Sequence, residues 1–521
     1  MYSFSTFFII LSKNRKFYTM RRVYTLFLLL TAILSLILPL DIAPLFDLDE
    51  GAFSEATREM LVGGDYITTY LNGELRFDKP ILIYWLQLIS IKFFGIDEFA
   101  FRLPSALASL IWSFSIFWFT NRFFGLRRAF FASFFMLTIL QINIISKASI
   151  ADALLNMFIS LSMFSIYIYY SNNRKKYLYL AFLSIALGTL TKGPVAIMIP
   201  LVVTLIFYII DGKFRDWLKM IFDPIGVLLF FSIALPWYIA EYMAQGDAFI
   251  DGFFIKHNIG RFSSAMEKHG GGIFYFIPVL LVGFLPFTSF IFNIFSDIKS
   301  IIKDKLKLYL IVWFSFVFIF FSFSGTKLPH YIIYGYTPLF ILGSLYIDKY
   351  NKNLIVYPTL VLLSILILLP DIANIIKKSI DDRFIALIIE DSYDIFDIWY
   401  RISILFLIGL ITFSKRLNSD IFLILSGFIM VFLVNFIAIP TYGELMQEPI
   451  KNGGLLARNR GYQVVMYRVN VPSFNVYYGG VVLKRKPRSG DIVFTKFTKL
   501  EDFKEYKILY RDGGFVLIEL Y

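Results

Sequence analysis

Apolar runs long enough to cross a lipid bilayer recur along most of this chain, separated by short hydrophilic breaks. A helix needs roughly 20 consecutive apolar residues to span the bilayer core, so the pattern predicts about thirteen transmembrane helices. The predicted fold class is therefore a mainly α, polytopic membrane protein. The runs are 24–40, 103–121, 129–146, 153–170, 178–191, 194–210, 225–241, 273–293, 308–324, 331–347, 354–370, 397–414 and 421–440.

Composition supports this class. Of the 521 residues, 58% are hydrophobic and 17% are charged, whereas a soluble globular domain is about 45–50% apolar. The chain has no cysteine, which excludes disulfides, thiolate catalysis and cysteine-ligated zinc. Its net charge of +12 comes from Lys and Arg in short clusters between apolar runs, which indicates membrane topology rather than a nucleic-acid partner.

The basic clusters predict an orientation. Lys and Arg residues between positions 13 and 22 precede the first run, as in a signal anchor whose N-terminus stays in the cytoplasm, and either Met1 or Met20 can be the start. The breaks at 122–128, 174–176, 213–219, 299–307, 349–352 and 415–416 are basic and fall on the same side. With an odd number of spans, the C-terminus is expected on the opposite, outer side.

Residues 47–80 form the longest polar segment and directly follow the first span. So many charges cannot lie in hydrocarbon, so this segment is expected at the outer membrane surface. Four apolar residues recur in it at helical spacing: Phe53, Ala56, Met60 and Leu61. Glu55, Arg58 and Glu59 take the other face, which predicts an interfacial helix that ends at Gly63-Gly64. Residues 80–94 predict a second interfacial helix.

Residues 441–521 change character and predict a small soluble α/β domain on the outer face, after a membrane domain of residues 1–440. Short strands are expected at 462–469, 474–482, 491–496 and 507–521, with a helix at 500–506. Asp512-Gly513-Gly514 predicts a hairpin turn.

Two acidic positions are candidates for catalysis. Asp49 and Glu50 form an acidic pair just outside the first span, where they can be a solvated pair or a helix cap, or can deprotonate and orient an acceptor at the membrane surface. Asp152 lies at the outer end of another predicted span, where a carboxylate near hydrocarbon is costly without a purpose.

Cations gather on the predicted outer face, where the positive-inside rule disfavours them. Each alone can be a surface charge or a lipid contact, but together they indicate an anionic ligand, because Lys and Arg are the usual phosphate binders. A phosphate at the bilayer surface suggests a lipid-linked phosphate. The segments are Arg76 to Pro80, Lys192 within Thr-Lys-Gly-Pro, residues 257–262, and Lys327 within residues 325–331.

The three histidines, His257, His269 and His330, are all expected outside. His257 with Asp78 or Glu50 can ligate a divalent metal ion, although no short ligand spacing such as HExxH is present.

The order of several motifs resembles the bacterial aminoarabinose transferase and protein mannosyltransferase families, which are C-type (GT-C) glycosyltransferases that use polyprenyl-phosphate sugars. The resemblance covers most of residues 25–345. The motifs are Asp49-Glu50, Arg58-Glu59-Met60-Leu61, Gly64-Asp65, Leu71-Asn72-Gly73, Asp78-Lys79-Pro80, Tyr84-Trp85, Arg102-Leu103-Pro104-Ser105, Ala151-Asp152, Thr191-Lys192-Gly193-Pro194, and residues 257–262, 270–272, 283–286 and 327–331.

The resemblance implies a GT-C architecture in a bacterial inner (plasma) membrane, with the active site facing the periplasm. It implies an inverting transfer of a sugar from a polyprenyl-phosphate donor to lipid A or another envelope acceptor. Asp49 corresponds to the catalytic or acceptor-orienting carboxylate, next to Glu50, and Asp152 supports the same site. The residues implied to hold the donor phosphate are Lys79, Arg261 and Tyr331, to which the outer cations Lys192 and Lys327 are added. Asp78 and His257 take the place of a metal pair for zinc or magnesium.

Two departures from the aminoarabinose transferases bear on the sugar and the acceptor. Gly51-Ala52-Phe53 replaces Thr-Arg-Tyr after the acidic pair, and Arg76 replaces Tyr. One alternative hypothesis is therefore a protein O-glycosyltransferase that uses the same donor. Another, from a different class, is a polytopic lipid or sugar transporter or flippase. Transporters usually show repeated halves with charges near the bilayer centre. A binding protein with a degenerate site is disfavoured, since Asp49 and Lys79 are present.

Overall fold

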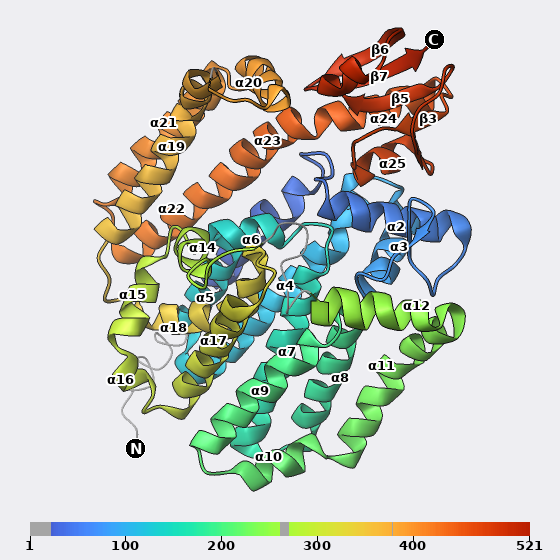
Figure 1. Ribbon diagram of the computed structural model, residues 1–521. Helices are drawn as coiled ribbons and strands as arrows, with labels where there is room; N and C mark the ends of the chain where they lie inside the picture. The colour runs from blue at the N-terminus through green and yellow to red at the C-terminus, as the bar shows by residue number, and fades with distance from the viewer. Residues whose placement is uncertain (1–21, 261–269, 378) are drawn as a thin grey trace, which may run out of the picture.

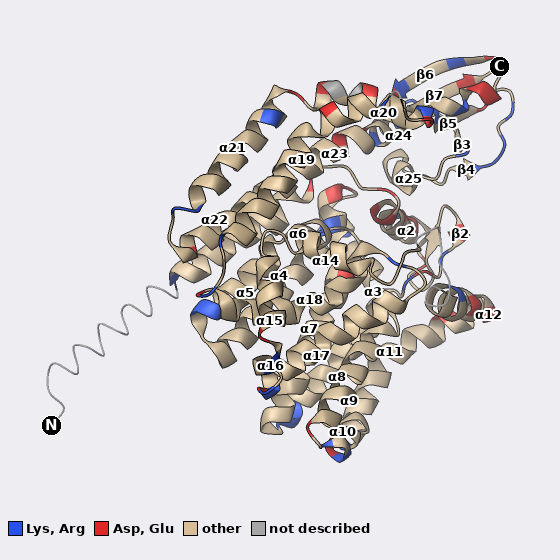
Figure 2. Ribbon diagram, turned by 60° about the vertical axis from the view of Figure 1, so that its left-hand side comes forward, with Lys and Arg blue, Asp and Glu red and all other residues tan. Residues whose placement is uncertain are grey.

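Long apolar helices dominate the computed structural model, which describes residues 22–260, 270–377 and 379–521. Within these ranges, 7 helices are long and apolar enough to cross a membrane. They are Arg22–Leu40, α4 (Glu98–Phe124), α7 (Asp152–Asn172), α11 (Pro224–Gln245), α17 (Lys305–Phe323), α19 (Asn353–Lys377) and the stretch Ser419–Met446. They form one bundle (Figure 1), whose middle carries few charges compared with its ends (Figure 2). The chain is a mainly helical, multi-pass membrane protein.

Shorter helices fill the bundle and its surface. The apolar ones of 10–17 residues are α3 (Leu82–Phe94), α9 (Val195–Ile210) and α21 (Ile398–Ser414). The others of the membrane part are α5 (Leu126–Thr138), α6 (Leu140–Ile145), α8 (Lys175–Lys192), α10 (Phe214–Ile221), α12 (Asp247–Phe249), α14 (Phe276–Gly283), α15 (Ser289–Ser296), α16 (Ile298–Ile301), α18 (Tyr336–Gly343) and α20 (Arg383–Ile395). The 3₁₀ or π segments are η1 (Ile33–Ile37), η2 (Leu38–Leu40), η3 (Ile250–Gly260), η4 (Pro329–Gly335) and η5 (Ser344–Tyr346).

Several predicted spans are interrupted, so the count of about thirteen from apolar runs is not confirmed. The run 129–146 divides into α5 and α6 at Ile139, whose backbone is extended. The run 273–293 divides into α14 and α15 around Pro286, because proline has no amide to continue a helix. The backbone amide of Leu140 donates to the carbonyl of Leu285 at 2.9 Å, so a hydrogen bond joins the two interruptions.

The polar segment after the first span folds into α2 (Asp49–Gly63), and Gly64 ends it at φ 73°, as the sequence predicts. The prediction that the charged side of this helix faces away from the protein is wrong. Glu55 and Arg58 are buried and form an ion pair of 2.7 Å. Burial raises the pKa of Glu55 to about 8. Arg58 also donates to the carbonyl of Gly479, because the C-terminal domain covers this side.

The C-terminal domain contains a five-stranded sheet of order β4-β3-β5-β7-β6. The helix that begins at Ser419, comprising α22 (Ser419–Phe432), η6 (Leu433–Ala438) and α23 (Ile439–Met446), runs past residue 440 and is followed by α24 (Glu448–Asn459). The strands are β3 (Val464–Met466), β4 (Leu483–Lys484), β5 (Ile492–Lys496), β6 (Tyr506–Asp512) and β7 (Phe515–Leu520). The hairpin turn between β6 and β7 is confirmed, and Gly513 and Gly514 both have positive φ there.

Two predicted elements of this domain are wrong. Residues 474–482 do not form a strand, because α25 (Pro472–Tyr478) occupies most of this segment, and the expected helix at 500–506 is a 3₁₀ turn, η7 (Phe497–Asp502). Two aromatic residues of α25 have different partners. Phe474 packs against Phe494 inside the domain, with ring centroids 4.3 Å apart, while Tyr477 faces the membrane domain.

The α25 helix attaches the C-terminal domain to the outer loop of the membrane domain. Tyr477 donates to Oε1 of Glu98 at 2.9 Å and accepts from the amide of Leu45 at 2.7 Å. Asp47 accepts hydrogen bonds from the amide and the hydroxyl of Ser473. A second attachment lies at the hairpin of β1 (Tyr70–Leu71) and β2 (Glu74–Leu75), where the Asn72 side chain bonds both backbone groups of Val482.

Gly51 lies at the closest point of this attachment. A Cβ built on it would overlap Oδ1 of Asp47 and lie 2.6 Å from the amide nitrogen of Ser473. We expect Gly51→Ala to destabilise the protein by about 1–3 kcal/mol, because overpacking forces the backbone to shift. Thermal unfolding in detergent measures this. Gly63→Ala in the same helix is the control, since nothing lies within 4 Å of its added Cβ. Equal melting temperatures for the two variants would contradict the close contact.

Candidate active site

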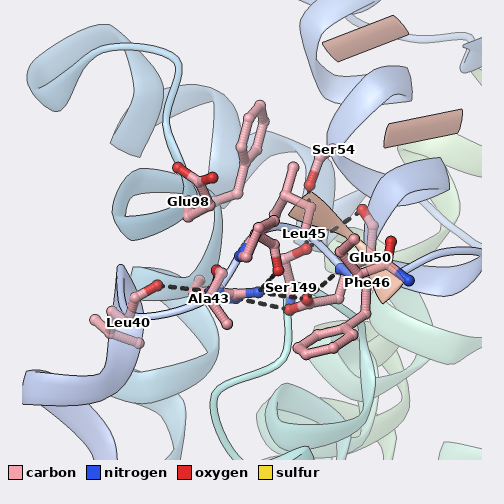
Figure 3. A network of polar contacts seen from close by, with 12 residues as sticks. Leu40, Ala43, Leu45, Phe46, Glu50, Ser54, Glu98 and Ser149 are labelled. Carbon is pink, nitrogen blue, oxygen red and sulfur yellow. Dashed lines mark hydrogen bonds and ion pairs between the residues drawn. The ribbon is translucent and has the colours of Figure 1, made fainter. Parts of the chain in front are cut away.

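Glu50 and Arg102 form a buried ion pair where α2 meets α4 (Figure 3). Nη2 of Arg102 lies 2.7 Å from Oε2 of Glu50, and Nε lies 2.9 Å from Oε1. Backbone groups satisfy the rest of the pair: the guanidinium donates to the carbonyls of Leu40, Ala43 and Pro44, and the carboxylate accepts from the amides of Phe46 and Ser149. The pair therefore fixes the segment between the first span and α2.

The structure gives Glu50 a positioning role instead of the predicted catalytic one. Both of its oxygens are occupied by Arg102 and backbone amides. Burial alone would raise the pKa of Glu50, but the guanidinium and the amides lower it, so the carboxylate stays ionised. An ionised acid that accepts four hydrogen bonds is a poor proton acceptor.

Asp49, the neighbouring residue, is exposed at the first turn of α2. No side chain in the described part of the structure forms an ion pair with it. It lines a cavity of about 520 Å³ together with Asp47, Lys147 and His330. The opposite wall is apolar and comes from α19, η6 and α23: Leu362, Leu366, Leu433, Val434, Ala438, Ile439 and Tyr442. This acceptor cavity, as we call it below, combines a carboxylate with a hydrophobic wall.

Asp152 begins α7 and lies in a second polar cluster. Its Oδ1 accepts from Nζ of Lys192 at 2.7 Å and from the hydroxyl of Tyr334, and Nε2 of His330 lies 3.9 Å away. Lys192 also donates to the Tyr334 hydroxyl at 2.7 Å. Asp152 therefore holds Lys192 in place, which agrees with a supporting role at the site.

A second cavity of about 200 Å³ carries most of the predicted phosphate ligands. Lys79, Lys192 and Tyr331 line it, as do Asp78 and His257. Tyr331 is buried, and Nζ of Lys192 lies 5.6 Å from the centroid of its ring. The structure thus brings together three of the five predicted phosphate-binding residues in one cavity, which we call the cation cavity.

Of the other two predicted phosphate ligands, the structure describes only Lys327, which does not line this cavity. Lys327 is buried and donates to the carbonyl of Ser324 at 2.6 Å, so its ammonium stabilises the loop before η4. Arg261 lies outside the described residues, as does His269. These two positions stay predictions.

His330 connects the two cavities. It lines the acceptor cavity, and the next residue, Tyr331, lines the cation cavity. Burial lowers the pKa of His330, and the charges of both Asp49 and Lys79 act on it. Asp49 and Lys79 are therefore both close enough to His330 for their charges to act on its imidazole.

Asp78 and His257 lie in direct contact, with Nε2 of His257 2.8 Å from Oδ1 of Asp78. Arg76 lies 3.2 Å from the other oxygen. Burial opposes ionisation of Asp78, but hydrogen bonding to His257 and the charges of Arg76 and Lys79 hold its pKa well below the usual range. Within the described ranges, no group of three or more His, Asp and Glu side chains could hold a metal ion. Two protein ligands are fewer than closed zinc sites use.

Sequence reasoning missed Lys147, which lines the acceptor cavity beside the Glu50–Arg102 pair. Burial lowers its pKa to about 7, and its ammonium donates to Oδ1 of Asn435 at 2.7 Å. The sequence carried one signal, since Lys147 stands five residues before Asp152 at the outer end of a span. Arg102 was noted only as part of a motif, and Tyr334 was not noted.

The arrangement has counterparts among known proteins. A family described as dolichyl-phosphate-mannose-protein mannosyltransferase matches residues 78–239. An undecaprenyl phosphate-alpha-4-amino-4-deoxy-L-arabinose arabinosyl transferase of Aeromonas hydrophila is 33% identical over 314 residues, which are 59% of this chain and 56% of that protein. An uncharacterized protein of Aquifex aeolicus is 32% identical over 59% of this chain and 69% of its own length.

The fold comparison extends over almost the whole chain. The crystal structure of ArnT from Cupriavidus metallidurans bound to undecaprenyl phosphate superposes with a TM-score of 0.80, at 18% identity, over 95% of this chain and 97% of that one. This chain has the fold of that structure. Its sequence is similar to the aminoarabinose transferases, and the match spans little more than half of the Aeromonas relative, 56%. The match to the protein mannosyltransferase family lies in the membrane part of the chain.

Because Glu50 and Asp49 lie in different environments, we expect removal of each charge to have a different effect on stability. We expect Glu50→Gln to destabilise the protein by about 3–5 kcal/mol, because it leaves the buried guanidinium of Arg102 without its counter-charge. Asp49→Asn, one residue away and exposed, should leave stability within about 0.5 kcal/mol of wild type. Thermal unfolding of the two purified variants compares them, and an unchanged melting temperature for Glu50→Gln would argue against the buried pair.

Proposed function

We propose that this protein transfers a sugar from a polyprenyl-phosphate donor to an acceptor at the outer membrane surface. The observation that carries this proposal is the position of Asp49: an exposed carboxylate facing a region between a cavity lined by cations and a cavity with an apolar wall. The Aeromonas relative and the ArnT crystal structure are named for undecaprenyl phosphate, a polyprenyl phosphate.

In this proposal the donor phosphate occupies the cation cavity. Lys79 and Lys192 stabilise the phosphate as the bond from the anomeric carbon to the phosphate oxygen breaks and negative charge develops on the leaving group. Such preorganised charge stabilisation is commonly the largest catalytic contribution. Lys192 is preorganised because Asp152 and Tyr334 hold its ammonium. A polyprenyl phosphate remains as the product.

The acceptor binds in the acceptor cavity and presents an oxygen to the sugar. Asp49 orients this group and takes its proton where it is a hydroxyl, while the new bond forms on the opposite face of the anomeric carbon from the phosphate. The apolar wall from α19 and α23 favours a lipid acceptor such as lipid A over a protein acceptor. With the basic breaks in the cytoplasm, this site and the C-terminal domain face the periplasm of a bacterial inner membrane.

Asp49→Asn tests the base. We expect the transfer rate to fall by about 10²–10⁴-fold, the usual contribution of general acid–base catalysis. Mass spectrometry of lipid A and of envelope glycoproteins from cells that express wild type or variant measures the transferred sugar. Asp41→Asn, an exposed carboxylate in the same outer segment, is the control. Sugar-modified acceptor at the wild-type level with Asp49→Asn would refute the assignment, and a loss confined to glycoproteins would favour the protein acceptor.

Lys79→Gln tests the phosphate site. We expect kcat/KM for the polyprenyl-phosphate sugar to fall by about 10²-fold, as for removal of one group that stabilises developing negative charge. Saturation kinetics on purified enzyme with varied donor measure this. The control Lys92→Gln removes a cation of α3 that lies over the ring of Tyr66 and lines neither cavity. Unaltered donor kinetics with Lys79→Gln would place the phosphate elsewhere.

We also propose a place for a divalent cation such as zinc or magnesium. Asp78 and His257 would supply the protein ligands, and oxygens of the donor phosphate would complete the coordination, as is usual for magnesium at phosphate sites. Such an ion neutralises phosphate charge. Metal content measured on protein purified with and without polyprenyl phosphate tests this. We expect stoichiometric metal only with the phosphate; full occupancy without it would contradict the two-ligand arrangement.

A further inference from the structure

The C-terminal domain contains a cleft of about 460 Å³ at one end of its sheet. Residues 466–469, from the last residue of β3 onwards, form one side, and residues 484–486, from the last residue of β4 onwards, form the other. β3 runs parallel to both β4 and β5, and the chain leaves β3 towards β4 but leaves β5 towards β6 and β7. In open sheets, ligands bind outside the carboxyl ends of parallel strands, and this cleft lies at the carboxyl ends of the parallel pair β3 and β4.

The cleft is strongly basic. Four of its seven lining residues are cations: Arg468, Lys484, Arg485 and Lys486. Asp491 pairs with Arg485 at 2.6 Å and Asp502 with Arg468 at 3.2 Å. In the described part of the chain, no carboxylate pairs with Lys484 or Lys486; Lys484 donates to the amide oxygen of Asn470 at 2.8 Å. The cleft therefore keeps a local charge excess.

The sequence around the cleft shows the same bias over a longer range. Residues 449–490 contain no Asp or Glu. Their cations are Lys451, Arg458, Arg460, Arg468, Lys484, Arg485, Lys486 and Arg488. A small domain with mixed surface charges is the ordinary arrangement for solubility, so a one-signed stretch of this length indicates an anionic ligand.

The cleft is also held at a fixed place relative to the candidate active site. Val482, two residues before Lys484, is bonded through both backbone groups to the side chain of Asn72. Asn72 belongs to the outer loop that carries Asp49, and Lys484 is close enough to Asp47 for their charges to interact. A ligand in the cleft would therefore lie on the same side of the protein as the acceptor cavity.

We propose that this cleft binds a phosphate group on the saccharide headgroup of the acceptor, an assignment that rests on the proposed function. The acyl part of such an acceptor enters the acceptor cavity, while its headgroup extends to the C-terminal domain, which lies above α2 and α3 in Figure 1. Lys484 and Lys486 supply the two cations that have no carboxylate partner, and Arg468 and Arg485 are held in place by Asp502 and Asp491.

Equilibrium binding to full-length protein in phosphatidylcholine nanodiscs tests the cleft. The probes are a water-soluble bisphosphorylated glucosamine disaccharide, the same disaccharide without phosphate, and inorganic phosphate. We expect Lys484→Gln/Lys486→Gln to raise the Kd for the bisphosphorylated disaccharide by roughly tenfold, since each lost charged hydrogen bond weakens binding appreciably. Lys504→Gln/Lys507→Gln, with the same charge change at exposed positions of the same domain, is the matched control.

The outcomes separate the cleft from the proposed function. An unchanged Kd in the Lys484/Lys486 variant, or equal losses in both double variants, would overturn the proposal. Inorganic phosphate that binds as tightly as the phosphorylated disaccharide would overturn the headgroup assignment. In transfer assays, we expect a higher KM for a phosphorylated acceptor with unchanged kcat and unchanged donor KM. Charge-dependent binding without transfer to any acceptor would refute the proposed function and still support the cleft.

Discussion

The buried ion pair between Glu50 and Arg102 determines where the candidate active site is built. Charges removed from water are stabilised only when their remaining hydrogen-bonding groups find partners, and here backbone groups from the end of the first span, the start of α2 and the loop before α7 supply them. Residues 40–50, α4 and the loop before α7 therefore meet at one point. Asp49 is the first residue beyond this point, so its exposure to the acceptor cavity follows from the burial of its neighbour.

The cations of the site are held by carboxylates before any ligand arrives. Asp152 holds Lys192, and Asp78 contacts both Arg76 and His257. A long lysine or arginine side chain would otherwise lose conformational freedom when it meets a phosphate, so these pairs reduce the entropy lost on binding. The same pairs lower the net charge of the cation cavity, which favours a phosphate of low charge, such as a monoester or diester, over free polyanions. The two cavities thus differ in chemistry: one is cationic and preorganised, the other is largely apolar.

Local sequence patterns predicted the parts of this structure that depend on local physics. The apolar runs identified the long helices, Gly63-Gly64 identified the end of α2, and Asp512-Gly513-Gly514 identified the hairpin. Most of the failures come from contacts between segments that are far apart in sequence. Glu55 and Arg58 were predicted to face solvent because nothing near them in sequence reveals that the segment of α25 covers them. Glu50 and Asp49 look alike in sequence, and only the partner Arg102, 52 residues away, separates their roles. The breaks at Ile139 and Pro286 were hidden because an apolar run looks the same whether it is continuous or broken.

The missing side chain at Gly51 has a consequence for how this protein can be recombined with its relatives. Ser473 rests against the backbone of α2 because Gly51 leaves the space open, and the Asp47 carboxylate completes that contact. A threonine, which the resemblance places at this position in the aminoarabinose transferases, would bring its side chain into this contact. The outer loop and the C-terminal domain therefore have complementary surfaces. A functional chimera would have to exchange the loop of residues 41–102 together with the C-terminal domain that packs on it. Exchange of either part alone should disrupt the interface between them.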